Sequence, residues 1–398
     1  MTNCGVGPKV WTFLPVLLLL AACRTGDQET PEYLVYDTIG DTLVVRDQVV
    51  SQWENPRRLE LDLVIGGTDT EGDLTFGRVD NIAVEPSGGI LVEDNQGGSV
   101  VRIGANGVFT GSVGRRGEGP GEYLLPMGIA VLKDGRIAVR DNRLFVISLY
   151  DSTGTFIERW PLRQLLRSSW GLEADQDGAL AVRADFSDSP PYTPPDEGFV
   201  ILSPEGSVVD SVPPPATPGD GEELWGHYHP KKHFARYSSE FVVVGVSNGY
   251  HFDIRGPHQT IRVEQPFEPV PVSPEERGAF DVEMALSTRL GDRSLDNYPP
   301  PPDFKAAYGR ILVTRTGQIW VFRHGRGEQW TTREVGEGLI YPYFREPLRI
   351  DVFDRDGRFL GVVEGDANID PKVVSNDTVW AVVTGEFDEH YVARYILR

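Results

Sequence analysis

Three histidines lie close together in the stretch HYHPKKH: His227, His229 and His233. Two histidines two positions apart point the same way in an extended segment, and histidine nitrogens are common zinc ligands. The pattern therefore offers a candidate zinc site, with His233 as the third ligand. Lys231 and Lys232 lie between the histidines and would repel a cation, so the alternative is a set of ordinary exposed loop histidines.

A second candidate set combines oxygen donors, with Asp80 and Asn81 in one stretch and Glu173 in another. Carboxylate and amide oxygens are the ligands that Ca²⁺ takes in proteins. Three such donors would suit calcium if their side chains converge. Glu173 is also a candidate ligand-binding residue.

The stretch GRRGEGPGEY, residues 114–123, combines four glycines with Arg115 and Arg116. Such a loop could cradle a phosphate, and the arginines could receive an anion. A phosphate loop should be followed by a helix, whereas the next residues, MGIAVLKDGRIAV, alternate and turn like a β-hairpin. We therefore interpret the stretch as a connection between structural repeats, in which Gly119 and Gly121 adopt positive φ.

The sequence carries none of the common catalytic fingerprints. No serine lies in a GxSxG pattern, no Ser–His–Asp set can be assembled, and no dinucleotide-binding or Walker motif occurs. This absence favours a binding role over an enzymatic one.

An internal repeat explains the glycine stretch. Residues 81–95 align without a gap on residues 128–142, at an offset of 47. Asp94 falls on Asp141, and both end a predicted strand. Their carboxylates are expected to accept backbone N–H groups in the following turn. The alternative is that they contact a ligand.

Each repeat predicts four short strands. Looser copies follow over residues 171–212, 238–263 and 311–363, and a last copy over residues 372–397 stops one strand short. Residues 58–67 have the register of a fourth strand but no repeat before them. They are expected to complete the last repeat and close a ring.

Two motifs carry a resemblance to known proteins. Gly117–Tyr123 resembles the GxGPGEF-like loops of bacterial six-bladed β-propeller lipoproteins, and Asp134–Asp141 resembles the strand core of NHL repeats. The resemblance implies an all-β, six-bladed propeller over residues 58–398. In calcium-dependent propeller lactonases the inner strands begin with acidic and amide ligands, which is where Asp80, Asn81 and Glu173 would lie.

The long insertions are predicted to emerge on one face. In an antiparallel four-stranded blade, the second-to-third loop and the connection to the next blade leave at the same end. The insertions over residues 185–197, 213–233, 266–304 and 323–347 all fall in such connections. Within 266–304, SPEER predicts a helix that Ser273 caps and that runs to about Leu290.

The N-terminus predicts a lipoprotein signal over residues 1–22. An apolar run too short to span a bilayer comfortably ends in LAAC, which resembles the lipobox of bacterial lipoproteins. The resemblance implies cleavage before Cys23 and attachment of lipid to it, with residues 23–57 as a tether and lead-in. The alternative is an ordinary signal peptide that happens to end at a cysteine. The mature chain then has no free thiol for catalysis.

The composition excludes nucleic acid as a partner. The chain has 59 acidic and 38 basic residues and a net charge of -21, whereas a nucleic-acid-binding protein needs clustered positive charge. Its 44 glycines and 30 prolines are typical of many short strands joined by turns.

Two functional hypotheses remain. The first is a cell-envelope protein, lipid-anchored in the outer membrane and facing the periplasm or the cell surface. It would bind a protein, peptide or carbohydrate through its loop-rich face. The alternative is a calcium- or zinc-dependent lactonase-like or lyase-like enzyme with its site at the channel mouth.

Overall fold

In the computed structural model, strands dominate and one α-helix occurs among the described residues. The residues described from 34 onward belong to one compact unit. Cys23 and the predicted signal peptide lie outside the described part of the chain, in which no helix is long and apolar enough to cross a membrane. The structure describes residue 1 and residues 34–47, 51–67, 74–162, 171–175, 178–186, 197–214, 226–238, 240–290, 298–334 and 340–398.

The strands come in groups of four, each pairing antiparallel with the next along the chain, as the repeat predicts. The tight turns of the first two groups match, because Gly88 and Gly135 have φ of 84° and 85°. The first three groups are β4 (Val79–Val84), β5 (Ile90–Asp94), β6 (Ser99–Ile103) and β7 (Phe109–Ser112); β10 (Pro126–Val131), β11 (Ile137–Asp141), β12 (Val146–Tyr150) and β13 (Phe156–Pro161); and β14 (Leu172–Ala174), β15 (Leu180–Asp185), β16 (Glu197–Leu202) and β17 (Val208–Val212).

The remaining groups diverge more in sequence but keep the same pairing order. The last of them supplies only three consecutive strands, as expected. They are β18 (Lys232–Ser238), β19 (Phe241–Val246), β20 (His251–Arg255) and β21 (Thr260–Glu264); β22 (Tyr308–Val313), β23 (Ile319–Arg323), β26 (Leu348–Phe353) and β27 (Phe359–Gly365); and β28 (Ile369–Ser375), β29 (Thr378–Thr384) and β30 (His390–Leu397).

The missing fourth strand comes from the N-terminal region. β3 (Arg57–Ile65) pairs antiparallel with β30, so residues 58–65 supply the fourth strand of the last group, as predicted. At its first residues β3 also pairs in parallel with β27, over Arg57 and Arg58, so these two groups form one eight-stranded sheet. Alternation places Ile65 in the core beside Val392, whereas Leu61 is exposed.

The lead-in contains more structure than a tether. β1 (Leu34–Ile39) and β2 (Thr42–Asp47) form a hairpin, and β2 pairs in parallel with β21. Val44 and Val45 are fully buried there. The sequence TLVVRD is therefore a strand because it covers the apolar outer edge of the fourth group, and no repeat marks it as one.

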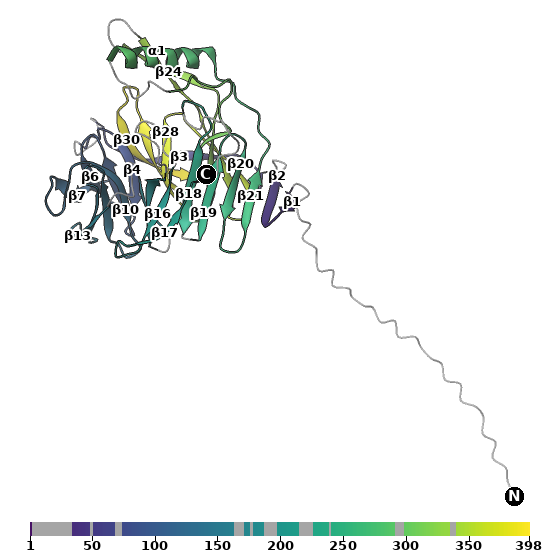
Figure 1. The fold of residues 1–398 in the computed structure, drawn as a ribbon, viewed down its shortest axis with the longest axis horizontal. Helices are drawn as coiled ribbons and strands as arrows, with labels where there is room; N and C mark the ends of the chain where they lie inside the picture. Colours follow the sequence, from purple (N-terminus) through teal and green to yellow (C-terminus); the bar gives the residue numbers. More distant parts are fainter. Residues whose placement is uncertain are drawn as a thin grey trace. The chain divides into compact units, whose positions relative to one another are not determined.

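Two insertions meet at one end of the sheets. α1 (Pro274–Leu290) lies between β21 and β22, and the hairpin β24 (Glu328–Glu334) and β25 (Ile340–Arg345) lies between β23 and β26. Figure 1 shows α1 and β24 together above the sheets, and α1 contacts β25. The predicted cap is present, because the Glu276 amide donates to Ser273 Oγ at 3.2 Å and the Ser273 amide donates to Glu276 at 3.0 Å.

The glycine stretch is a connection between groups, as interpreted from the sequence. It contains only the short paired segments β8 (Arg115–Arg116) and β9 (Glu122–Tyr123), and β10 follows rather than a helix. Gly121 has φ of 75°, whereas Gly119 does not have the positive φ that we expected. Tyr123 is buried, and its hydroxyl joins the connection to the Val100 amide at 2.9 Å.

Candidate functional site

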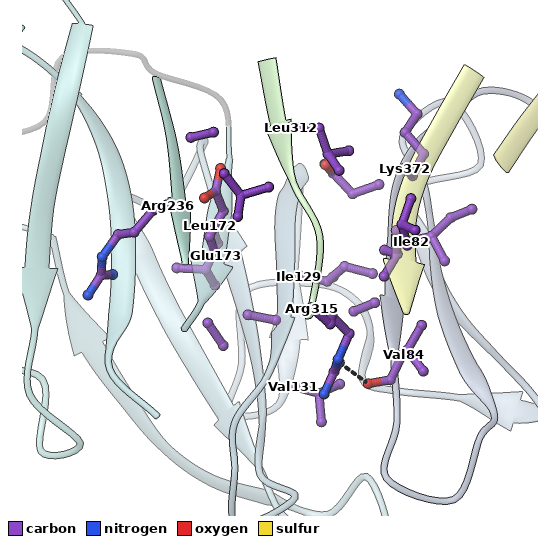
Figure 2. A pocket seen from close by; sticks show the side chains of 18 of the residues that line it. Ile82, Val84, Ile129, Val131, Leu172, Glu173, Arg236, Leu312, Arg315 and Lys372 are labelled. Atoms are coloured by element: carbon purple, nitrogen blue, oxygen red, sulfur yellow. Dashed lines mark hydrogen bonds between the residues drawn. The ribbon is translucent and has the colours of Figure 1, made fainter. Parts of the chain in front are cut away.

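A cavity of about 330 Å³ lies where the first strands of the groups face one another. Residues of β4, β10, β14, β18, β22 and β28 line it, and Figure 2 shows their side chains around one space. Its aliphatic layer consists of the lining residues Ile82, Ile129, Leu172, Leu312 and Val373, of which the first three are largely buried. The strand order therefore brings together residues that are far apart in the sequence.

Among the polar lining residues, Asp80, Asn81 and Glu173 lie near the starts of their strands, and Arg310 and Lys372 lie no further than the middle of theirs. The end at which these strands start is the mouth of the cavity, and it is the end at which the insertions enter β18 and β22. The predicted oxygen donors Asp80, Asn81 and Glu173 all line this one cavity. Sequence reasoning missed the cations that share it, which are Arg183, Arg236, Arg310, Arg315 and Lys372.

Asp80 and Asn81 have partners of their own. Asp80 accepts hydrogen bonds from Arg78 Nε at 2.9 Å and from Asn95 Nδ2 at 2.8 Å. The amide nitrogen of Asn81 donates to Glu93 Oε2 at 2.9 Å. Both residues are thus held in place by the first group before any ligand arrives.

Glu93 is a fully buried carboxyl group directly behind the mouth. Its Oε1 has no hydrogen-bond partner within the part of the chain that the structure describes. Burial raises the pKa of Glu93 to about 8, which the Asn81 hydrogen bond only partly offsets. At pH 7 the carboxyl is therefore mainly protonated, and it adds little negative charge to the cavity.

Two of the cations that line the cavity share one carboxylate. Arg310 and Lys372 each lie 2.8 Å from an Asp370 oxygen. Burial alone would raise the pKa of Asp370, but the two cations outweigh it and the pKa is lowered. Glu173 and Arg183 are 3.9 Å apart, which is beyond hydrogen-bond distance.

The lower part of the cavity holds Arg315, which donates to the carbonyl oxygen of Val84 at 3.4 Å (Figure 2). Arg236 turns away from the space and forms a buried ion pair with Asp175. Among the described residues, no group of three or more His, Cys, Asp or Glu side chains could hold a metal ion. A divalent cation at Asp80, Asn81 and Glu173 would also face the cationic lining.

The three histidines of the candidate zinc set do not meet. His227 Nε2 lies 3.0 Å from a carboxylate oxygen of Glu283, and His229 Nε2 lies 2.9 Å from the carbonyl oxygen of Pro300. His233 is buried, and its Nε2 lies 3.1 Å from Ser247 Oγ. Burial lowers the pKa of His233 to about 3, so it is neutral at physiological pH.

The repeated aspartates bind backbone. Asp94 accepts from the amides of Gly77, Arg78 and Gly97 at 3.0, 2.9 and 2.9 Å. Asp141 accepts equivalent bonds, from Leu124, Arg143 and Leu144 at 2.6, 2.8 and 2.9 Å. Each carboxylate therefore ties the segment before the first strand to the turn after the second, and both are buried.

Arg115 is paired within its own loop. Its guanidinium lies 2.7 Å from Glu122 Oε1, and the Gly119 amide donates to Glu122 Oε2 at 2.8 Å. The Gly119 amide and Arg115 lower the pKa of Glu122. The loop thus supplies its own carboxylate as the partner of Arg115 and of the Gly119 amide, and Arg116 is exposed.

Next to the insertions lies the Lys305 cluster, which we define as Lys305, Glu276, Glu346, His324 and Tyr228. Lys305 Nζ is 2.6 Å from Glu276 Oε1 and 2.8 Å from Glu346 Oε1, and the lysine side chain is fully buried. His324 Nδ1 is 3.0 Å from Glu346, and Tyr228 donates to Glu276 at 3.0 Å. The cluster ties α1 to the loops that flank the β24–β25 hairpin.

No family model matches this sequence, and no curated protein matches it. Solved structures do. A member of the DUF4221 family from Bacteroides vulgatus is 13% identical with a TM-score of 0.55, over 87% of this chain and 99% of that chain. Virginiamycin B lyase from Staphylococcus aureus is 11% identical with a TM-score of 0.43, over 84% and 99%. A gluconolactonase from Xanthomonas campestris is 14% identical with a TM-score of 0.42, over 85% and 99%. At these identities the likeness concerns the fold alone, and with the DUF4221 protein the chain shares a mostly-β fold of the propeller type.

Proposed function

We propose that this chain is a lipid-anchored cell-envelope protein that binds a small polar ligand at the mouth of a closed, six-bladed β-propeller. The mouth is the observation that carries the proposal. It gathers Asp80, Asn81, Glu173, Arg310 and Lys372 from four separate strands around one cavity. A concave site with an apolar middle and a few convergent polar groups is the usual form of a small-molecule site.

The groups at the mouth are accessible to a ligand. The side chains of Glu173 and Arg310 are 39% and 35% exposed, although both belong to inner strands. The surrounding structure is also ordered. A hydrogen bond to Glu93 holds Asn81, and the carboxylates of Asp94 and Asp141 fix the ends of the strands to which they belong. Preorganised polar groups on rigid strands bind a ligand with little cost of ordering.

The first experiment blocks the cavity without changing its charge. Ala174 is half-buried and lines the cavity, so Ala174→Trp would fill it. In a thermal-shift screen of sugars, sugar acids, amino acids and short peptides, ligands of the wild-type protein should bind this variant at least tenfold more weakly. The control is Val208→Trp on β17, where valine is 54% exposed.

The result of that screen separates the two functional hypotheses. If Ala174→Trp and Val208→Trp bind every wild-type ligand equally, the cavity is not the binding site. Tight stoichiometric binding of calcium or zinc, with hydrolysis of a lactone, would favour the metal-dependent enzyme. The observation that supports this alternative is that Asp80, Asn81 and Glu173 line the same cavity.

The anchor is tested at Cys23. We expect Cys23→Ser to abolish incorporation of a radiolabelled fatty acid and to release the protein from the membrane fraction, because the lone thiol after LAA has no other evident role. Cys4→Ser is the matched control and should retain the label. Equal labelling of the wild type and Cys23→Ser would contradict a lipid anchor.

A further inference from the structure

The charges that face the cavity run against those of the whole chain. The chain carries a net charge of -21, yet four cationic side chains face the cavity besides Arg236, which turns away to Asp175, and only two acidic ones line it. An acidic protein repels anions at long range, so a binding site for an anion must supply local positive charge. This reversal of sign points to the chemistry of the ligand.

At the mouth the cations are not fully compensated by their neighbours. Asp370 is the ion-pair partner that Arg310 and Lys372 share in the described structure, so one negative charge faces two positive ones. Arg310 also donates to the carbonyl oxygen of Pro371 at 2.9 Å, and its guanidinium lies 3.9 Å over the Phe322 ring. Each cation still keeps further donors, because an ammonium has three N–H groups and a guanidinium has five. The pair can therefore accept one more carboxylate without displacing Asp370.

The acidic lining residues do not cancel this surplus. Asp80 lies 2.9 Å from Arg78 outside the cavity and accepts a second bond from Asn95. Glu173 faces Arg183 at 3.9 Å. Glu93 behind Asn81 is mainly uncharged at neutral pH, because burial raises its pKa to about 8. The local balance near Arg310 and Lys372 is thus positive.

The aliphatic layer adds a second requirement. Leu312 and Val373 are partly exposed aliphatic residues of the cavity lining, and the edges of the buried Ile82, Ile129 and Leu172 complete it. Figure 2 shows these last three around the same space as Lys372. A volume of about 330 Å³ lies at the lower end of the range for small-molecule sites. An inorganic anion would leave this layer unused, whereas an organic acid would cover it.

We propose that the ligand of this cavity is a small organic carboxylate, whose carboxylate binds Arg310 and Lys372 and whose body rests on the aliphatic layer. The inference rests on the proposed function, and it names the class of ligand. It also excludes a divalent cation as the primary ligand, because a cation and the Arg310–Lys372 pair would repel each other in one small cavity.

The test compares acids with neutral analogues of the same shape. Full-length protein in detergent is titrated by calorimetry with D-glucuronate against D-glucose, and with benzoate against benzamide. At least one acid should bind saturably while its neutral partner binds at least tenfold more weakly. Raising the salt concentration from 50 to 500 mM should weaken binding of the acid, because the electrostatic screening length becomes about threefold shorter.

Three variants locate the site. Arg310→Gln and Lys372→Gln should each weaken binding of the acid at least tenfold. The matched control is Arg349→Gln, at an exposed arginine on β26, which should leave the affinity unchanged. Glu173→Gln removes a negative charge from the cavity and should tighten the acid several-fold. A metal site predicts the opposite for Glu173→Gln, since it loses a ligand.

The outcomes separate the inference from the proposed function. If a neutral or cationic compound binds and Ala174→Trp blocks it, the cavity is a binding site but the carboxylate inference is wrong. If an acid binds equally well to Lys372→Gln, Arg310→Gln and the control, the inference is also wrong. If no compound of any class binds, both proposals fail.

Discussion

A chain that begins at residue 68 is expected to form no stable folded monomer, whereas a chain that begins at residue 33 should keep the full melting temperature. The difference lies in β3. It pairs with β30 from Leu59 to Ile65, and without it that edge exposes a row of unpaired N–H and C=O groups. Val392 and Phe76, which pack beside Ile65, would lose their cover.

A third truncation separates the two N-terminal elements. A chain that begins at residue 51 lacks the β1–β2 hairpin but retains β3. It should fold with a lower melting temperature, because Val44 and Val45 no longer cover β21. Full burial of one such side chain stabilises by about 1.5–3 kcal/mol.

Scanning calorimetry and light scattering measure these three chains. We expect a monomer with the wild-type transition for the chain from 33, a monomer with a lowered transition for the chain from 51, and aggregates for the chain from 68. Addition of a synthetic peptide of residues 54–67 should partly rescue the last. Equal melting temperatures for the chains from 33 and 68 would rule out closure of the ring by β3.

The backbone of this protein was largely predictable because its repeat is a backbone pattern. The offset of 47 places Gly88 and Gly135 in equal turns and Asp94 and Asp141 in equal hydrogen-bond networks. The same reasoning placed residues 58–67 as a fourth strand. The alternation of apolar and polar residues, together with the turn residues, fixes the local register of neighbouring strands. These predictions depend on that local register alone.

The mouth was predictable only in part. Asp80 and Glu173 were identified because they lie at the start of predicted inner strands, whereas Arg310 and Lys372 lie in copies too divergent to align with the first repeat. The separate partners of the three histidines were unpredictable for a different reason. Whether loop side chains converge depends on tertiary partners such as Glu283 and Ser247, which periodicity does not reveal.

The second large effect concerns the Lys305 cluster. We expect Lys305→Met to destabilise the protein by about 3–5 kcal/mol at pH 7, because it leaves the carboxylates of Glu276 and Glu346 without their shared cation. Lys133→Met, at an exposed lysine, is the matched control and should change stability by at most about 0.5 kcal/mol. Urea denaturation of both variants measures the difference.

The pH dependence of stability tests the electrostatic cause, because an electrostatic loss of stability changes with pH in a predictable direction. In the wild type, burial opposes ionisation of Glu276 and Glu346, but Lys305, with Ser273 and His324, outweighs it and lowers the pKa of both carboxyls. A lowered pKa contributes stability above the unfolded value, about 4.3, and this contribution is lost as the pH falls through the folded value. In Lys305→Met both carboxyls lose a partner that lowers their pKa, although Glu276 keeps Ser273 and Glu346 keeps His324. We therefore expect burial to raise the folded pKa values, so that the variant loses stability as the pH rises above about 4.3. The difference in unfolding free energy between wild type and variant should therefore be widest at pH 7 and narrow towards pH 4.

The triple variant, Lys305→Met with Glu276→Gln and Glu346→Gln, should recover most of the lost stability at pH 7, since no buried charge is then unpaired. A difference independent of pH, or a triple variant no more stable than the single one, would mean that Lys305 acts through packing alone.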